Sequence, residues 1–246
     1  MAPEFYVKPW KIVVYPLFAV LAIGGIYLLS VWKHRQDQGI FGKKQADAPA
    51  NMDDFAEVRA FFPTSFSDTL RLVGTTVWMK NGNTIAYFPY VGGQVDFVHR
   101  TGMVPPLAQL EIKKVIRAAV PSKVDDGISH GSRQTFVVFA LPGSTALYAS
   151  PIGVTDGHSE AYFDDMLFFY DDPHVIYNYW PKSVWTAIDA HRVEPGMSEL
   201  ETRLAVGMKM HTAGLTEGNR TVTYDENGKT WTVTYDHNKA TEIKQG

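Results

Sequence analysis

The sequence predicts an α+β protein with a single N-terminal transmembrane helix, a β-rich middle domain of the small barrel or sandwich type, and a C-terminal module of two helices and a β-meander. Three observations predict it: a long uncharged apolar run, a series of short β-type runs separated by turn residues, and a capped helix ahead of alternating strands. The predicted parts are a tail at 1–11, a span at 12–32, a linker at 33–60, the β-rich domain at 61–181 and the C-terminal module at 182–246.

The predicted span reads IVVYPLFAVLAIGGIYLLSVW, which is 21 positions without a charge. A helix of that length covers roughly 30 Å, the thickness of the hydrocarbon core of a bilayer. The run ends at a basic cluster rather than at a small-residue cleavage site, which indicates a retained anchor and not a signal peptide. The residues expected to serve the anchor, its aromatic belt and its small-residue face are Trp10, Pro16, Ala22, Gly24, Gly25, Trp32, Lys33 and Arg35.

The charges around the span favour a cytoplasmic soluble part. Two lysines precede the span, whereas Lys33, Arg35, Lys43 and Lys44 follow it. Because basic residues accumulate on the cytoplasmic side of single spans, the short tail is expected outside and the soluble part in the cytoplasm.

The middle region carries several strand patterns. Apolar runs at 70–79 and 84–90 flank Asn81-Gly82-Asn83, and this arrangement predicts a β-hairpin. The run at 107–116 fits either a short helix or a strand. Further strands are predicted at 134–141, 146–152 and 166–170.

The C-terminal region predicts two helices and three strands. Residues 183–191 suit a helix, and Ser198 with Glu201 forms a capping-box pattern that opens a second helix, which Gly207 ends. Strands are predicted at 219–224, 230–235 and 239–243, with apolar residues and threonines alternating in the first two.

The order Gly196-Met197-Ser198, then a helix ending at Val206-Gly207, then a β-meander resembles the SmpA/OmlA family, whose fold is called BamE-like. The resemblance covers about residues 184–243. It implies a small envelope-associated module that binds other proteins and performs no chemistry, and it implies a periplasmic location. Members of the family typically carry a lipidated cysteine, whereas this chain has no cysteine.

Composition excludes several functions. The chain has 246 residues with 23 basic and 26 acidic side chains, so it lacks the basic surface that nucleic acid requires. The absence of cysteine excludes disulfides, thiolate metal sites and a cysteine nucleophile. We expect no cofactor.

One alternative is a metal or acid–base site in a membrane-tethered metal-binding protein or hydrolase. Its candidate ligands lie close together in the sequence: Asp156, His158, Asp171, Asp172 and His174. Carboxylate and imidazole groups bind divalent cations, but the same residues also serve as turn and helix-cap residues, and the spacing matches no ligand motif. We therefore assign turns and caps to this cluster first, and a metal only as the alternative.

A group of aromatic residues follows this cluster, namely Tyr177, Tyr179, Trp180 and Trp185. We assign these residues to core packing first and to partner contacts as the alternative. Tyrosine and tryptophan are enriched where proteins contact one another, and they are also common in β-rich cores.

Together these patterns predict a non-catalytic, single-span accessory subunit of a bacterial inner-membrane complex, of photosynthetic or respiratory type, whose partners are other integral membrane subunits and the lipid bilayer. The layout of short tail, one span and β-rich body is similar to that of the H subunit of purple-bacterial reaction centres.

Overall fold

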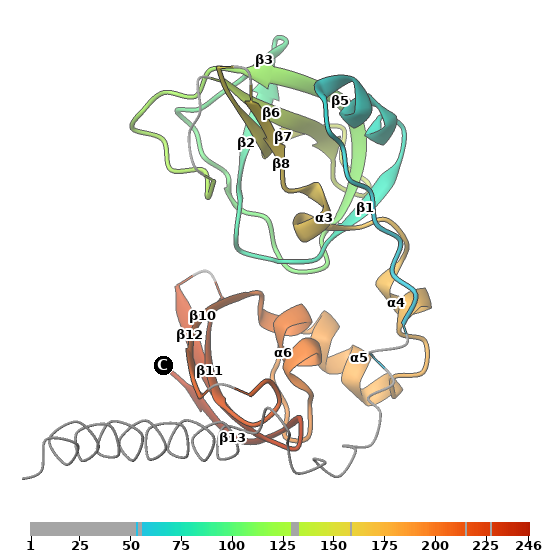
Figure 1. Ribbon diagram of the computed structural model, residues 1–246, viewed down its shortest axis with the longest axis vertical. Coiled ribbons are helices and arrows are strands. Elements are labelled where there is room, and N and C mark those ends of the chain that lie inside the picture. The colour runs from blue at the N-terminus through green and yellow to red at the C-terminus, as the bar shows by residue number, and fades with distance from the viewer. Residues whose placement is uncertain (1–52, 54–55, 129–132, 158, 215, 227) are drawn as a thin grey trace, which may run out of the picture. The chain divides into compact units, whose positions relative to one another are not determined.

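A computed structural model describes residue 53 and residues 56–128, 133–157, 159–214, 216–226 and 228–246. The chain divides into two compact units, residues 1–55 and residues 56–246, and the second is an α+β unit that is rich in strands and has few helices (Figure 1). No helix among the described residues is long and apolar enough to cross a membrane. The predicted span at 12–32 and all eight of its anchor residues, from Trp10 to Arg35, lie outside the described residues.

The first part of this unit is built mainly from strands. Its helical segments are α2 (Phe66–Thr69), the 3-10 helix η2 (Leu70–Leu72) and α3 (Asp164–Leu167). Its strands are β1 (Thr76–Met79), β2 (Ala86–Val91), β3 (Gln94–Val95), β4 (Gly102–Met103), β5 (Gln109–Ala118), β6 (Arg133–Ala140), β7 (Leu147–Asp156), β8 (Ser159–Tyr162) and β9 (Phe168–Phe169).

These nine strands form one antiparallel sheet in the order β3-β2-β7-β6-β5-β1-β9, with β4 beside β2 and β8 beside β7. Its central strand β6 is buried on both faces: Val137 and Phe139 belong to one apolar cluster, whereas Phe136 and Val138 belong to another. Successive side chains of a strand point to opposite faces, so β6 supplies the centre of two separate cores. Whether this sheet is a small barrel or a sandwich stays a prediction.

The second part contains α4 (Pro173–Ile176), α5 (Lys182–Asp189), α6 (Glu199–Val206) and the strands β10 (Met208–Ala213), β11 (Thr221–Glu226), β12 (Lys229–Asp236) and β13 (Lys239–Gln245). The four strands form an antiparallel meander in sequence order. Val222, Tyr224, Val233 and Tyr235 are buried on one face, and threonine hydroxyls pair across β11 and β12 on the other.

Several predictions for the C-terminal module are confirmed. The Ser198 side chain accepts from the amide of Glu201, while the Glu201 carboxylate accepts from the amide of Ser198, so the predicted capping box is complete. Gly207 ends α6 at a positive φ of 91°. The meander has one strand more than predicted, because residues 208–213 pair with β11.

The predicted Asn81-Gly82 hairpin is wrong. β1 pairs with β5 and β9, and β2 pairs with β3, β4 and β7, so the two strands are not neighbours. The turn residues have other contacts: a Cβ on Gly82 would lie 2.2 Å from the backbone nitrogen of Pro106, and Asn83 donates to the C-terminal module. An Asn-Gly pair fixes a turn but not the partner of the strand that follows it.

Other boundaries of the middle region also differ from the predictions. Residues 107–116, which fitted a helix or a strand, contribute to the long strand β5. The predicted strand at 70–79 begins instead as η2 at Leu70–Leu72, and only Thr76–Met79 form the strand β1. The predicted strand at 166–170 is reduced to the two residues of β9, because the aspartates before it open the short helix α3.

The two sheets are joined at a buried seam formed by Asn83 and the end of α6. The Nδ2 of Asn83 donates to the carbonyl of Val206 at 3.2 Å, and the Asn83 side chain lies close to Gly207. An added Cβ on Gly207 would lie 2.7 Å from Asn83 Nδ2 and 2.8 Å from the carbonyl oxygen of Gly82. Gly207 is therefore required both by its positive φ and by the close approach of the two sheets.

We expect Gly207→Ala to lower the free energy of unfolding by about 3 kcal/mol, since the new methyl group meets backbone and a buried amide. Gly143→Ala is the matched control, because Gly143 also has a positive φ (72°) but its added Cβ would meet no atom within 4 Å. The control is expected to lose only about 1 kcal/mol. Denaturant unfolding of the full-length chain in detergent, followed by tryptophan fluorescence, measures both. Equal losses would contradict a tight seam.

Candidate interaction surface

The chain enters unit 56–246 along residues 56–60, which lie against the core of the C-terminal module. Ala56 and Val58 pack on that core. Arg59 donates from Nη2 to the carbonyl of Tyr170 at 2.5 Å, and the same nitrogen lies 3.3 Å from the carboxylate of Asp171. One side chain thus fixes the start of this unit to the segment between β9 and α4.

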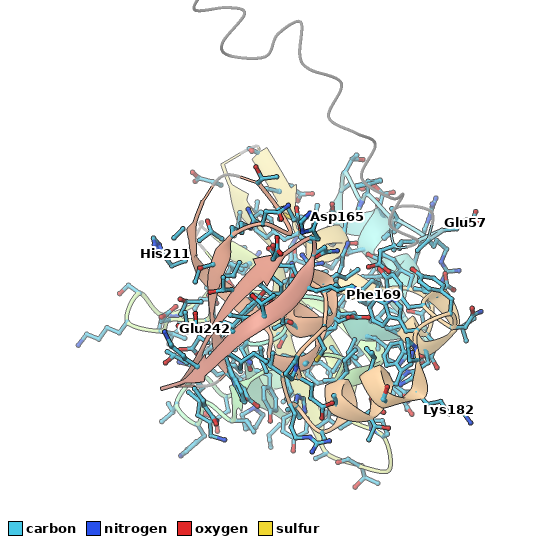
Figure 2. All side chains as sticks on the ribbon, turned by 90° about the horizontal axis from the view of Figure 1, so that it is seen from below. Glu57, Asp165, Phe169, Lys182, His211 and Glu242 are labelled. Atoms are coloured by element: carbon cyan, nitrogen blue, oxygen red, sulfur yellow. The ribbon has the colours of Figure 1, made fainter. Side chains whose placement is uncertain are left out.

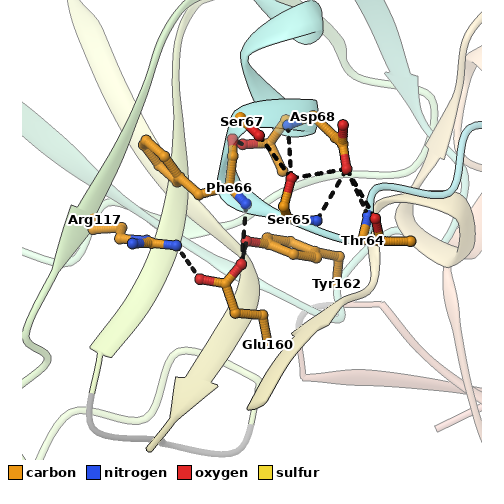
Figure 3. A network of polar contacts seen from close by, with 9 residues as sticks. Thr64, Ser65, Phe66, Ser67, Asp68, Arg117, Glu160 and Tyr162 are labelled. Carbon is orange, nitrogen blue, oxygen red and sulfur yellow. Dashed lines mark hydrogen bonds and ion pairs between the residues drawn. The ribbon is translucent and has the colours of Figure 1, made fainter. Parts of the chain in front are cut away.

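The following residues, 61–72, continue as a strap that is fixed to the nine-stranded sheet. The ring of Phe61 meets that of Tyr170 edge to face, with centroids 6.1 Å apart. At α2, the amide of Phe66 donates to Glu160 Oε2 at 3.0 Å, and Glu160 also forms an ion pair with Arg117 (Figure 3). The guanidinium of Arg117 lies 4.4 Å from the centroid of the Phe66 ring. The strap is therefore held by an aromatic contact at its start and by polar contacts at α2.

Aromatic side chains gather where the strap begins. Tyr177 and Trp180 stack with centroids 4.4 Å apart, Trp180 packs on Trp185 at 5.2 Å, and His174 stacks on the outer face of Trp185 at 3.9 Å. Tyr177, Trp180 and Trp185 are only 4%, 7% and 9% exposed and belong to the C-terminal core, with Phe169. We call His174, Val175, Tyr177, Tyr179, Trp180 and Trp185 the aromatic corner.

The predicted partner-binding residues thus divide into two groups. Tyr177, Trp180 and Trp185 are core residues, because stacking buries their rings against one another. Core packing is therefore confirmed for these three, and a partner contact through them stays a prediction. Tyr179 is 36% exposed and stays a predicted contact. The aromatic pattern in the sequence did not point to Val175, because valine has no aromatic ring. Val175 lies in α4 and is 65% exposed.

Two carboxylates contact His174, one on each side of its ring. Asp172 caps α4 by accepting from the amide of His174, and its Oδ1 lies 3.1 Å from His174 Nδ1. The other ring nitrogen of His174 lies 3.4 Å from the carboxylate of Asp189 in α5. Figure 2 shows Glu57 and Lys182 at separate places on the molecule, with both side chains directed outward.

The residues of the metal alternative are placed by these contacts. Asp171 pairs with Arg59, Asp172 caps a helix, and Asp156 ends β7 at the turn into β8. His158 lies outside the described residues. Within the described ranges, no group of three or more His, Asp or Glu side chains is arranged to hold a metal ion. Sequence reasoning missed Asp189 and Arg59, which are distant in sequence from the residues that they contact.

A buried acid lies next to the corner, at the start of α3. Asp164 is fully buried, Tyr170 donates its hydroxyl to Asp164 Oδ2 at 2.5 Å, and Asp164 Oδ1 has no hydrogen-bond partner among the described residues. Burial raises the pKa of Asp164 to about 6, against the opposing effect of the Tyr170 hydrogen bond. Burial also raises the pKa of the Tyr170 hydroxyl.

Comparisons with protein-family models, with curated proteins and with solved structures find no match to this chain. The resemblance of residues 184–243 to the SmpA/OmlA family therefore stays a prediction from the sequence.

We expect the stability of the protein to fall as pH rises from about 4 through 6. The carboxyl of Asp164 binds its proton more tightly in the folded state than at its ordinary pKa of 3.8, so the folded state holds more protons in this interval. Asp164→Asn should remove this slope and raise the free energy of unfolding at pH 7.5 by about 2 kcal/mol. Asp156→Asn, at an exposed turn, is the control. An unchanged slope in Asp164→Asn would contradict the assignment.

We expect Glu160→Ala to release the strap. The substitution removes the acceptor for the amide of Phe66 and the ion pair with Arg117, so amide hydrogen exchange over residues 64–72 should become about tenfold faster. Glu111→Ala serves as control, because the Glu111 carboxylate forms an exposed ion pair with Lys113 on the same sheet. Equal exchange in both variants would show that the strap is held in another way.

Proposed function

We propose that the chain is a non-catalytic, single-span accessory subunit that stabilises a larger complex of a bacterial inner membrane. The observation that carries the proposal is the uncharged run of 21 residues at 12–32, followed by a unit whose first residues are fixed by Arg59.

In this proposal the span packs against helices of other subunits through its small-residue face at Ala22, Gly24 and Gly25. The soluble part contacts those subunits next to the membrane, on the cytoplasmic side that the flanking charges favour. The C-terminal module fits a protein-binding role of the kind that the SmpA/OmlA resemblance implies. Its capped helix followed by an antiparallel meander agrees with that resemblance, and β10 is an addition to it.

Purification of the full-length chain from native membranes in mild detergent tests the proposal. We expect a stoichiometric complex with other integral membrane proteins, and we expect exchange of residues 12–32 for an unrelated apolar span to abolish it while the chain stays in the membrane. A chain that elutes alone would contradict the proposal and would turn attention to the Asp/His residues of the metal alternative.

A further inference from the structure

The carboxyl of Asp164, at the start of α3, is buried in a place that suits its neutral form better than its charged form. The residue is 0% exposed, and its Oδ1 has no hydrogen-bond partner among the described residues. Its Oδ2 accepts a hydrogen bond from the Tyr170 hydroxyl at 2.5 Å. A carboxylate that is buried with one oxygen unpaired is much less favourable than the neutral acid. Ionisation of Asp164 therefore favours any movement that brings water to Oδ1.

Tyr170 connects this carboxyl to the residues by which the chain enters the unit. The Tyr170 ring meets the ring of Phe61 edge to face, with centroids 6.1 Å apart. The Tyr170 carbonyl accepts a hydrogen bond from Arg59 Nη2 at 2.5 Å, and Arg59 is also paired with the carboxylate of Asp171 at 3.3 Å. Residues 59–61 are thus attached to the same tyrosine whose hydroxyl binds the buried acid.

The other charged groups that act on this pair leave the neutral acid favoured. Burial raises the pKa of Asp164 to about 6, the hydrogen bond from Tyr170 opposes this rise, and the negative charge of Asp165 in α3 adds to it. Arg59 is the cation that acts on Tyr170, and its guanidinium is already paired with Asp171. The charge of the buried acid therefore changes between about pH 5 and pH 7.

We propose that the proton on Asp164 controls how firmly residues 59–61 are attached to the rest of the unit. With the proton bound, Tyr170 stays packed over the buried acid and holds Phe61 and Arg59. With the proton lost, the carboxylate draws water toward Oδ1, Tyr170 moves away more often, and its contacts with the two residues open with it. This inference concerns the unit alone and does not depend on the accessory role.

A spin label at position 60 measures this attachment. Because the chain has no cysteine, Ala60→Cys in the full-length chain in detergent gives one labelled site, on an exposed residue between Arg59 and Phe61. We expect the ratio of mobile to immobile label to rise about tenfold between about pH 5 and pH 7.5, as linkage predicts for a carboxyl whose pKa is shifted from 3.8 to about 6. A ratio that stays constant over this interval would overturn the proposal.

Three substitutions in the labelled chain separate Asp164 from the other titrating groups, His174 included. Asp164→Asn keeps the size of the side chain and has no proton to lose, so the ratio should no longer change with pH. Asp156→Asn, at an exposed turn, should keep the wild-type rise. Tyr170→Phe keeps the ring but removes the hydroxyl that favours the charged acid, so the rise should end at a higher pH. A wild-type rise in Asp164→Asn, or an unshifted end point in Tyr170→Phe, would overturn the proposal.

Discussion

The side-chain amide of Asn83 is the contact on which the arrangement of the two sheets depends. It is buried, and it donates to the carbonyl of Val206, at the last residue of α6, and to that of Asp225, at 3.2 and 3.5 Å. Losing a buried hydrogen bond of this kind costs about 1–3 kcal/mol, because the carbonyl left behind has no water. Since Gly207 must be small for this approach, the seam tolerates few other residues.

Because the seam holds the two sheets together, residues 56–72 can be attached to both of them. Residues 56–60, just before the strap, rest on the C-terminal core through Ala56 and Val58, whereas α2 rests on the nine-stranded sheet through Glu160. If the two sheets moved independently, these attachments could not persist together. The aromatic corner is apolar inside, because stacking buries the rings of Tyr177, Trp180 and Trp185. Val175, Tyr179 and the aspartates lie at the surface.

Local patterns in the sequence predicted local structure well. The Ser198–Glu201 box and the alternation around Val222 and Val233 identified α6 and two strands, because capping and period-two burial are properties of short segments. Pairing between distant segments was not predictable in the same way. The Asn81-Gly82 turn suggested a hairpin, but the partners of β1 and β2 come from the next hundred residues.

The candidate surface shows the same division. The aromatic residues were visible as a group in the sequence, but whether a ring faces the core or the solvent depends on what packs over it, and that comes from Phe169 and the C-terminal sheet. Asp172 was visible as a cap. No pattern in the sequence pointed to Arg59 or Asp189, because each contacts a residue that is distant in sequence. Arg59 pairs with Asp171, and Asp189 lies beside His174.

The claim that the Asn83 seam holds the two sheets together is tested most directly by denaturant unfolding of the full-length Asn83→Asp variant in detergent, because this substitution removes the amide donor and keeps the size of the side chain. A fall of at least about 1 kcal/mol in the free energy of unfolding is the predicted result, since the carbonyl of Val206 loses its buried donor. An unchanged free energy of unfolding would contradict it.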